Sequence, residues 1–157
     1  MQLTSTSFQQ GAEIPSYYTS DGEDASPELS WRDAPADTQS FALIVHDPDA
    51  PRPGGFTHWV VYNIPPETVH IEENVPDTER VSGLGIQGKN DAGKIGYMGP
   101  APPSGTHRYF FRLYALNSML DLGVRATYKE VSDAIKGHVI AQAELMGTYA
   151  NQRERAA

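Results

Sequence analysis

Glycine and proline interrupt this chain so often that long helices have little room to form. The 157 residues include 14 glycines and 12 prolines, and no single linker collects them. Both residue types are unfavourable inside helices and central strands, and both are common in turns. Their frequency predicts a mostly β protein, built from short strands joined by turns.

The length is that of one ordinary domain, and neither a repeat nor a linker divides it, so residues 1–157 are expected to form a single domain. Hydrophobic residues make up 39% of the chain, with 2 Trp, 8 Tyr and 5 Phe. A chain of this size buries enough surface to fold without a metal or a disulfide. Cysteine is absent, which excludes a disulfide framework, a thiol nucleophile and a cysteine-based zinc site.

The formal net charge is -8, and residues 1–50 alone hold nine acids against one base. A chain of this charge repels nucleic acids and anionic membranes, so neither is an expected partner and no stable membrane association is expected. No run of 18 apolar residues and no signal-peptide pattern occur in the sequence. These features predict a soluble, cytoplasmic protein.

Three segments have strong strand patterns, each next to a loop rich in proline or glycine. Residues 40–46 form a continuous apolar run, which is typical of a strand buried on both faces. Residues 58–64 and 106–116 place alternate side chains on two faces. Weaker strand signals fall on residues 3–8, 28–31 and 69–71.

Helix signals occur only near the end of the chain. Thr127 and Glu130 have the spacing of a capping box, followed by apolar residues at helical spacing. Residues 138–146 are predicted as a second helix that Gly147 ends, and residues 150–157 as a frayed polar tail. Strands first and helices last favour an antiparallel β-sandwich with short C-terminal helices.

Two carboxylates lie in a stiff turn directly after the first of these strands. Residues 47–51 read DPDAP, and each proline restricts its own backbone and that of the residue before it. Asp47 and Asp49 either face a ligand or only cap the turn through their side chains. The motif alone leaves both interpretations open.

Histidines open the other two strong strands. His58 and His107 each start a strand, and Tyr109 shares a strand face with His107. Each histidine alone also fits an ordinary structural role. Gathered at one spot with Asp47, these groups would suit the oxygens of phosphate, sulfate or a carboxylate. The carboxylate of Asp47 would suit an amine, so a small zwitterion with a phosphate and an amine also fits.

The loop over residues 96–105 reads GYMGPAPPSG. Its three prolines have no N–H group, so few backbone donors remain near the following strand. A phosphate-cradling P-loop needs consecutive N–H groups and a lysine, and this loop has neither. We interpret it as a rigid wall beside the candidate site.

Residues 47–51, the FTHWVVYN segment at 56–63 and the GPAPPSGTHRY segment at 99–109 together resemble the phosphatidylethanolamine-binding protein family. The order and spacing of all three segments match, and the likeness runs over residues 8–149, the expected core. The short chain is similar to the family's prokaryotic, Raf kinase inhibitor-like branch. The resemblance implies the family's antiparallel β-sandwich, with an anion-binding pocket at one end.

The resemblance also implies which residues form that pocket, and it implies no cofactor and no metal. The ligand-binding residues would be Asp47, His58, Gly99, Pro100, His107 and Tyr109. The residues that shape the site would be Asp49, Pro51, Arg52, Phe56 and Arg108, with Arg108 in a structural ion pair. Ala101 stands where many prokaryotic relatives have a cysteine, which removes thiol redox chemistry.

The leading interpretation is a binding protein for a small anionic or phosphorylated ligand, with a regulatory role left open. One alternative is a hydrolase that uses His58 and His107 as acid and base, either alone or with a metal held by histidine and aspartate. Against it, the chain has no activated nucleophile motif and no metal-ligand spacing, so we expect no enzyme. Another alternative is a protease or kinase inhibitor acting through surface loops. The sequence identifies neither the ligand nor a protein partner, and it leaves a homodimer open.

Overall fold

The computed structural model describes residues 1–156, and most of their regular structure is strand. The strands are β1 (Gln2–Thr4), β2 (Leu29–Arg32), β3 (Ser40–Asp47), β4 (Phe56–Ile64), β5 (His70–Ile71), β6 (Arg80–Val81), β7 (Gly85–Gln87), β8 (Thr106–Leu116) and β9 (Val139–Ala150). The helices are the single 3-10 turn η1 (Ser16–Tyr18), α1 (Tyr128–Ile135) and α2 (Gln152–Ala156). Within residues 1–156, no helix is both long enough and apolar enough to cross a membrane.

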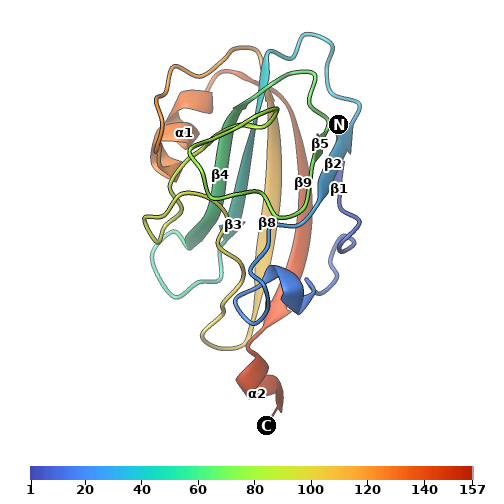
Figure 1. Cartoon of the computed structure of the whole chain (residues 1–157), viewed down its shortest axis with the longest axis vertical. Coiled ribbons are helices and arrows are strands. Elements are labelled where there is room, and N and C mark those ends of the chain that lie inside the picture. Colours follow the sequence, from blue (N-terminus) through green and yellow to red (C-terminus); the bar gives the residue numbers. More distant parts are fainter. Residues whose placement is uncertain (157) are drawn as a thin grey trace.

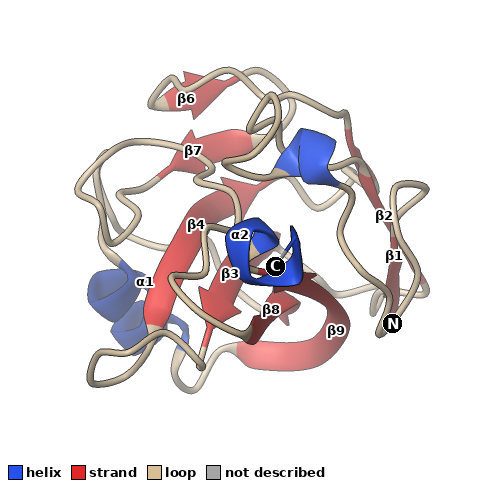
Figure 2. Cartoon of the chain, turned by 90° about the horizontal axis from the view of Figure 1, so that it is seen from below, coloured by secondary structure: helices blue, strands red, loops and turns tan. Residues whose placement is uncertain are grey.

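The strands form two antiparallel sheets. The small sheet has the order β1-β2-β5, and the large sheet has the order β6-β7-β4-β3-β8-β9. Figure 2 shows the small sheet on one side of the large sheet and α1 on the other. The predicted antiparallel β-sandwich is therefore confirmed, with one helix added as an outer layer.

The main core fills the space between the two sheets. The inner face of the large sheet contributes the buried side chains of Leu43, Val45, Trp59, Phe111 and Leu113. On the opposite face, Val131 and Ile135 of α1 belong to a second buried cluster with Ile44 and Val60. Strand β3 is thus covered on both faces, which explains its continuous apolar run.

Helix α1 begins where the capping box predicts. Oγ1 of Thr127 accepts a hydrogen bond from the Glu130 N–H, and the Glu130 carboxylate accepts one from the Thr127 N–H. Gly137 follows the C-cap residue with a φ of 80°. Glycine adopts this left-handed conformation without strain, so the chain can turn sharply into β9.

The predicted second helix over residues 138–146 is wrong, because this segment forms most of β9. Strand β9 pairs with β8 from Thr106↔Ala150 to Leu116↔Val139. The spacing of its apolar residues is compatible with a helix, but pairing with a long neighbouring strand also satisfies its backbone groups. That pairing turns Ala143 and Leu145 into the core between the sheets. Tertiary context therefore overrides the local helical pattern.

Gly147, predicted to end that helix, lies inside β9 instead. A Cβ atom at this position would be 2.6 Å from Cγ1 of Ile14 and 2.8 Å from Cε2 of Phe8. The residue is therefore suited to glycine because the N-terminal segment packs directly against the backbone of β9.

The end of the chain also differs from the prediction of a frayed tail, since residues 152–156 form α2. Oδ1 of Asn151 accepts hydrogen bonds from the N–H groups of Arg153 and Glu154 at 3.0 and 3.1 Å. Nδ2 of Asn151 donates to the carbonyl groups of Pro102 and Pro103. The C-terminal turn is thus attached to the proline-rich loop.

Three chain segments meet at one end of the large sheet. Because β3 and β4 are antiparallel, the last residue of β3 pairs with the first of β4, as Asp47↔Phe56. Strand β8 extends past β3, since His46 is already paired with Phe110 and residues 106–109 lie beyond. Figure 1 shows β8 and β9 side by side, reaching toward α2 at this end. The beginnings of β4 and β8 therefore flank the loop that follows β3.

Candidate functional site

A cavity of about 180 Å³ lies at this end of the sheet. Strands β4 and β8 supply one part of its wall, and the loops after β3 and before β8 supply the rest. Its lining comprises Asp47, Ala50, Pro51, Arg52, Phe56, His58, Met98, Ala101, Pro102, Pro103, His107 and Tyr109. Four of the six predicted ligand-binding residues, from three different segments, thus share one pocket.

Asp47 and His107 form a buried pair in this pocket. Nδ1 of His107 donates a hydrogen bond to Oδ2 of Asp47 across 2.6 Å, and the two side chains are 8% and 4% exposed. Oδ1 of Asp47 accepts a hydrogen bond from the Asp49 N–H at 2.8 Å. Both oxygens of Asp47 are therefore occupied. Because Nδ1 of His107 is the donor, Nε2 is the ring nitrogen left to meet a ligand.

His58 is held in the same manner by a backbone carbonyl. Its Nδ1 donates to the Met98 carbonyl oxygen at 2.5 Å, so Nε2 is again the remaining nitrogen. Burial lowers the pKa of His58, and the hydrogen bond to Met98 and the charge of Asp47 oppose this only in part. The ring is therefore neutral at pH 7, with Nε2 as an acceptor.

Tyr109 lies between the two imidazoles. Its ring centroid is 5.3 Å from that of His58 and 6.5 Å from that of His107. The hydroxyl is buried and has no hydrogen-bond partner among residues 1–156. Burial, followed by the negative charges of Asp47 and Asp49, raises the pKa of Tyr109 well above its usual range. This hydroxyl is therefore a protonated donor that lacks an acceptor.

Asp49 and Arg108 hold the DPDAP turn against β8. Nε and Nη2 of Arg108 donate to the two carboxylate oxygens of Asp49 at 2.9 and 2.8 Å, and the Arg108 N–H adds a third bond. The Arg108 guanidinium lowers the pKa of Asp49, so the pair stays charged in neutral solution. Arg108 thus makes the structural ion pair expected of it, outside the pocket lining.

Arg52 and Phe56 lie at the rim of the pocket. The Arg52 guanidinium carbon is 5.3 Å from the centroid of the Phe56 ring, within range of a cation–π contact. Phe56 also contacts His58 inside the pocket, since the centroids of the two rings are 4.8 Å apart. Pro51 also lines the cavity, as predicted for a residue that shapes the loop.

Gly99 and Pro100 are buried next to the pocket but are not part of its lining. The Gly99 N–H donates to Oδ1 of Asp24 at 2.8 Å, and the Pro100 carbonyl accepts from the N–H and the hydroxyl of Ser20. The backbone donor of Gly99 is therefore engaged. These two residues fix the position of the wall that residues 101–103 form.

The sequence did not single out Asp24 or Met98, although both position groups in this site. Asp24 has a φ of 55° and reaches the wall loop from 75 positions away. No periodic pattern marks such a contact. In the structure Gly99 leaves room for this contact, since a Cβ atom there would collide with Oδ1 of Asp24.

The other histidines lie elsewhere. Nδ1 of His46 is 3.0 Å from Oγ1 of Thr57, and its ring stacks on Tyr128. Nε2 of His70 is 2.8 Å from a carboxylate oxygen of Glu28 in the small sheet. Neither histidine lines the pocket. Within residues 1–156, no three His, Asp or Glu side chains are grouped so as to hold a metal ion.

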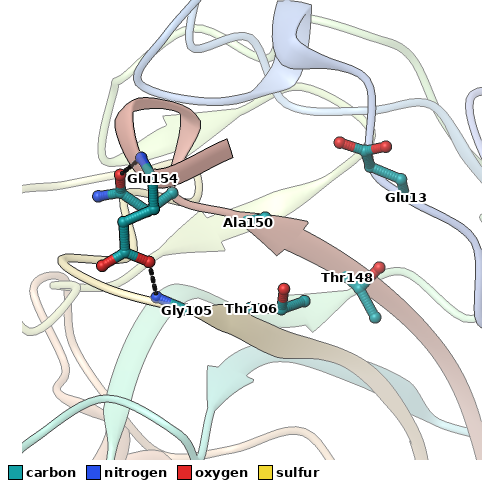
Figure 3. Close-up of a pocket in the computed structure, with 7 residues that line it drawn as sticks. Glu13, Gly105, Thr106, Thr148, Ala150 and Glu154 are labelled. Carbon is teal, nitrogen blue, oxygen red and sulfur yellow. Dashed lines mark hydrogen bonds between the residues drawn. The ribbon is translucent and has the colours of Figure 1, made fainter. Parts of the chain in front are cut away.

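A wider cavity of about 480 Å³ lies near α2 and is shown in Figure 3. Glu13 and Glu154 stand on opposite sides of it, above Thr106 and Thr148 on neighbouring strands. One oxygen of Glu154 already accepts the Gly105 N–H at 2.7 Å. This cavity contains no histidine and no buried unpaired group, so we place the candidate site in the smaller pocket.

Comparison with known proteins finds relatives over almost the whole chain. The sequence model of the phosphatidylethanolamine-binding protein family matches residues 4–150. A protein of Methanothermobacter thermautotrophicus is 52% identical over 149 residues, covering 95% of this chain and 98% of its own. A protein of Aquifex aeolicus is 49% identical over 152 residues, covering 95% and 88%. Both carry only the name UPF0098 protein.

Two crystal structures have the same fold. A phosphatidylethanolamine-binding protein homologue of Chlamydia trachomatis superposes with a TM-score of 0.86 at 42% identity, covering 94% of this chain and 95% of its own. An Escherichia coli protein, described as a member of the mammalian phosphatidylethanolamine-binding protein family, superposes with a TM-score of 0.87 at 31% identity. It covers 95% of this chain and 97% of its own.

Proposed function

The chain belongs to the phosphatidylethanolamine-binding protein family, and on that premise we propose that it binds a small anion, or the phosphorylated head group of a larger ligand, in the pocket around His107 and Tyr109. The observation that carries the proposal is the buried, protonated and unpaired hydroxyl of Tyr109, whose ring contacts the imidazoles of His58 and His107. A buried donor without a partner costs about 1–3 kcal/mol, which an anionic oxygen would recover.

The two histidines can complete the coordination of an anion. Each has its Nδ1 tied to a protein acceptor, so each has Nε2 available. In the neutral ring Nε2 accepts, whereas in the charged ring it donates to an anion. Binding of a fully ionised anion therefore requires a proton, from the ligand or from solvent. Asp47 lies behind His107 and compensates a positive charge on that ring.

The size and lining of the pocket also support a small ligand. A volume of about 180 Å³ accommodates a phosphate or carboxylate group with a short substituent. Most of the remaining lining is apolar and includes Met98, Ala101, Pro102 and Pro103. A few polar groups in an apolar cavity are typical of small-molecule sites.

We further propose a cytoplasmic setting without stable membrane association. The net charge of -8 supports the absence of stable membrane association, because anionic head-group surfaces repel such a protein. A lipid-derived ligand would then be met through its head group alone.

Calorimetric titration of inorganic phosphate tests the proposal. His107→Ala and His58→Ala should each weaken binding about ten- to a hundred-fold, the effect of one charge-assisted hydrogen bond. His70→Ala is the control, since His70 lies in the small sheet with Glu28. Absence of binding to the wild type at millimolar phosphate, or an equal loss in His70→Ala, would overturn the assignment.

Hydrolysis is the second candidate function, favoured by the Asp47–His107 pair. A carboxylate that orients a histidine is also the arrangement of a general base. The test is the release of nitrophenol from p-nitrophenyl phosphate. Turnover that disappears in His107→Ala would support catalysis, and saturable binding of phosphate without turnover would support the binding function instead.

A further inference from the structure

The acids near the pocket are already engaged. Asp47 is the only acid in the lining, and its two oxygens accept from His107 and from the Asp49 N–H. Both oxygens of Asp49 accept from Arg108. An ammonium group on a ligand would therefore find no free carboxylate here. The zwitterion with an amine, which the residue types alone suggested, fits this geometry poorly.

A cation, by contrast, stands unpaired at the rim. Among residues 1–156, Arg52 forms no ion pair, and its guanidinium carbon lies 5.3 Å from the centroid of the Phe56 ring. Arg108, Arg112 and Arg125 each lie 2.6–2.9 Å from a carboxylate. Arg52 is also exposed, so its guanidinium can turn toward a ligand without breaking an ion pair.

The backbone that carries Arg52 is fixed. The Arg52 N–H donates to the Ala50 carbonyl at 2.8 Å, and the Arg52 carbonyl accepts from the Gly55 N–H at 3.1 Å. The centroid of the Phe56 ring is 5.3 Å from the guanidinium carbon of Arg52 and 4.8 Å from the centroid of the His58 ring. Arg52 and His58 thus contact the same aromatic ring, so a ligand that extends from His58 toward the rim can meet the exposed guanidinium.

We infer that Arg52 determines specificity, by selecting ligands that carry a second anionic group a few bonds away from the one held at His107 and Tyr109. The inference rests on the proposed anion-binding function of that pocket. A guanidinium presents a planar pair of donors that matches a carboxylate with two parallel hydrogen bonds. An ammonium at the same place would be repelled by Arg52. The preferred ligand class is therefore a small phosphorylated carboxylate.

Three phosphate monoesters of similar size test this inference by calorimetry at pH 7.5. Phosphoglycolate carries a second anion, ethyl phosphate an uncharged substituent and phosphoethanolamine an amine. The wild type should bind phosphoglycolate about fivefold more tightly than ethyl phosphate, as expected for one exposed ion pair. Phosphoethanolamine should bind no more tightly than ethyl phosphate.

Arg52→Gln should abolish the preference for phosphoglycolate over ethyl phosphate, because the second anion then meets no guanidinium. The matched control is Arg80→Gln in β6, which removes the same charge outside the pocket lining and should keep the preference. A preference that survives Arg52→Gln, or that disappears equally in Arg80→Gln, would overturn the role of Arg52. Tighter binding of phosphoethanolamine than of ethyl phosphate would overturn it too.

Failure of the underlying function gives a different result. If the wild type binds none of the three esters, both the pocket and the role of Arg52 are wrong. If ethyl phosphate binds in a manner that depends on His107 but all three esters bind equally, only the role of Arg52 is wrong.

Discussion

His107 donates a hydrogen bond from Nδ1 to Oδ2 of Asp47 across 2.6 Å, although the two residues are 60 positions apart in the chain. The bond joins the beginning of β8 to the end of β3. It also decides which nitrogen of His107 meets the cavity. One buried contact therefore contributes both to the fold and to the chemistry of the site.

The first prediction concerns this contact and the free energy of unfolding. Asp47→Ala leaves the buried Nδ1–H of His107 without an acceptor, which should destabilise the fold by about 1–3 kcal/mol. Urea denaturation followed by circular dichroism measures the change. Asp37→Ala, at an exposed turn position, should alter stability by less than about 0.5 kcal/mol. Equal effects of the two substitutions would contradict the importance of the Asp47–His107 bond.

The second prediction separates stability from binding at Tyr109. Tyr109→Phe removes a hydroxyl that has no partner, so the free energy of unfolding should stay the same or rise slightly. The affinity for phosphate should nevertheless fall about tenfold, because one donor to the anion is lost. Tyr17→Phe, at an exposed position, should change neither quantity. A clear loss of stability in Tyr109→Phe would show that the hydroxyl has a partner within the folded chain.

The third prediction concerns pH and His58. Burial lowers the pKa of this histidine in the folded state below its value of about 6.5 in an unfolded chain. The neutral ring thus contributes stability above pH 6.5 or so, and this contribution is lost as the pH falls, because the unfolded chain takes up the proton first. An anion at Nε2 favours the charged ring and therefore binds with proton uptake.

Sulfate isolates this effect, since its charge is constant between pH 5 and 8. The increase in Tm that sulfate produces should be larger at pH 5.5 than at pH 8, and His58→Gln should reduce the difference. Phosphate should behave otherwise, with affinity highest around pH 6 to 7, because acid charges His58 and discharges the phosphate near pH 6. A stabilisation by sulfate that does not depend on pH would contradict proton uptake.

The fourth prediction concerns Asp24 as a positioning residue. Asp24→Ala removes the acceptor of the Gly99 N–H and should loosen the wall of the pocket. We expect faster hydrogen exchange at Gly99 and an affinity for phosphate reduced about three- to tenfold, the effect of one lost hydrogen bond. Asp24→Asn keeps an oxygen acceptor and should restore both. Identical behaviour of the alanine and asparagine variants would exclude a role through this bond.

Local pattern was sufficient where neighbouring residues determine the structure. Alternation over residues 106–116 predicted β8 with the bounds observed, since a half-buried strand must alternate. The Thr127–Glu130 box predicted the beginning of α1, because both of its hydrogen bonds form within four residues. The turn chemistry of residues 47–51 placed two carboxylates after a buried strand.

The sequence by itself therefore determined the fold class and most elements, and its motifs drew attention to the four polar groups that share the pocket. Only the tertiary structure decided that residues 139–150 are a strand, because pairing with β8 outweighs an ambiguous local pattern. The tertiary structure also decided that Asp24 accepts the hydrogen bond of the Gly99 N–H and that Asp47 accepts one from His107. Within residues 1–156 it left Arg52 without an ion pair, next to the Phe56 ring. The two hydrogen bonds join residues that are 60 or more positions apart, so no local spacing in the sequence encodes them.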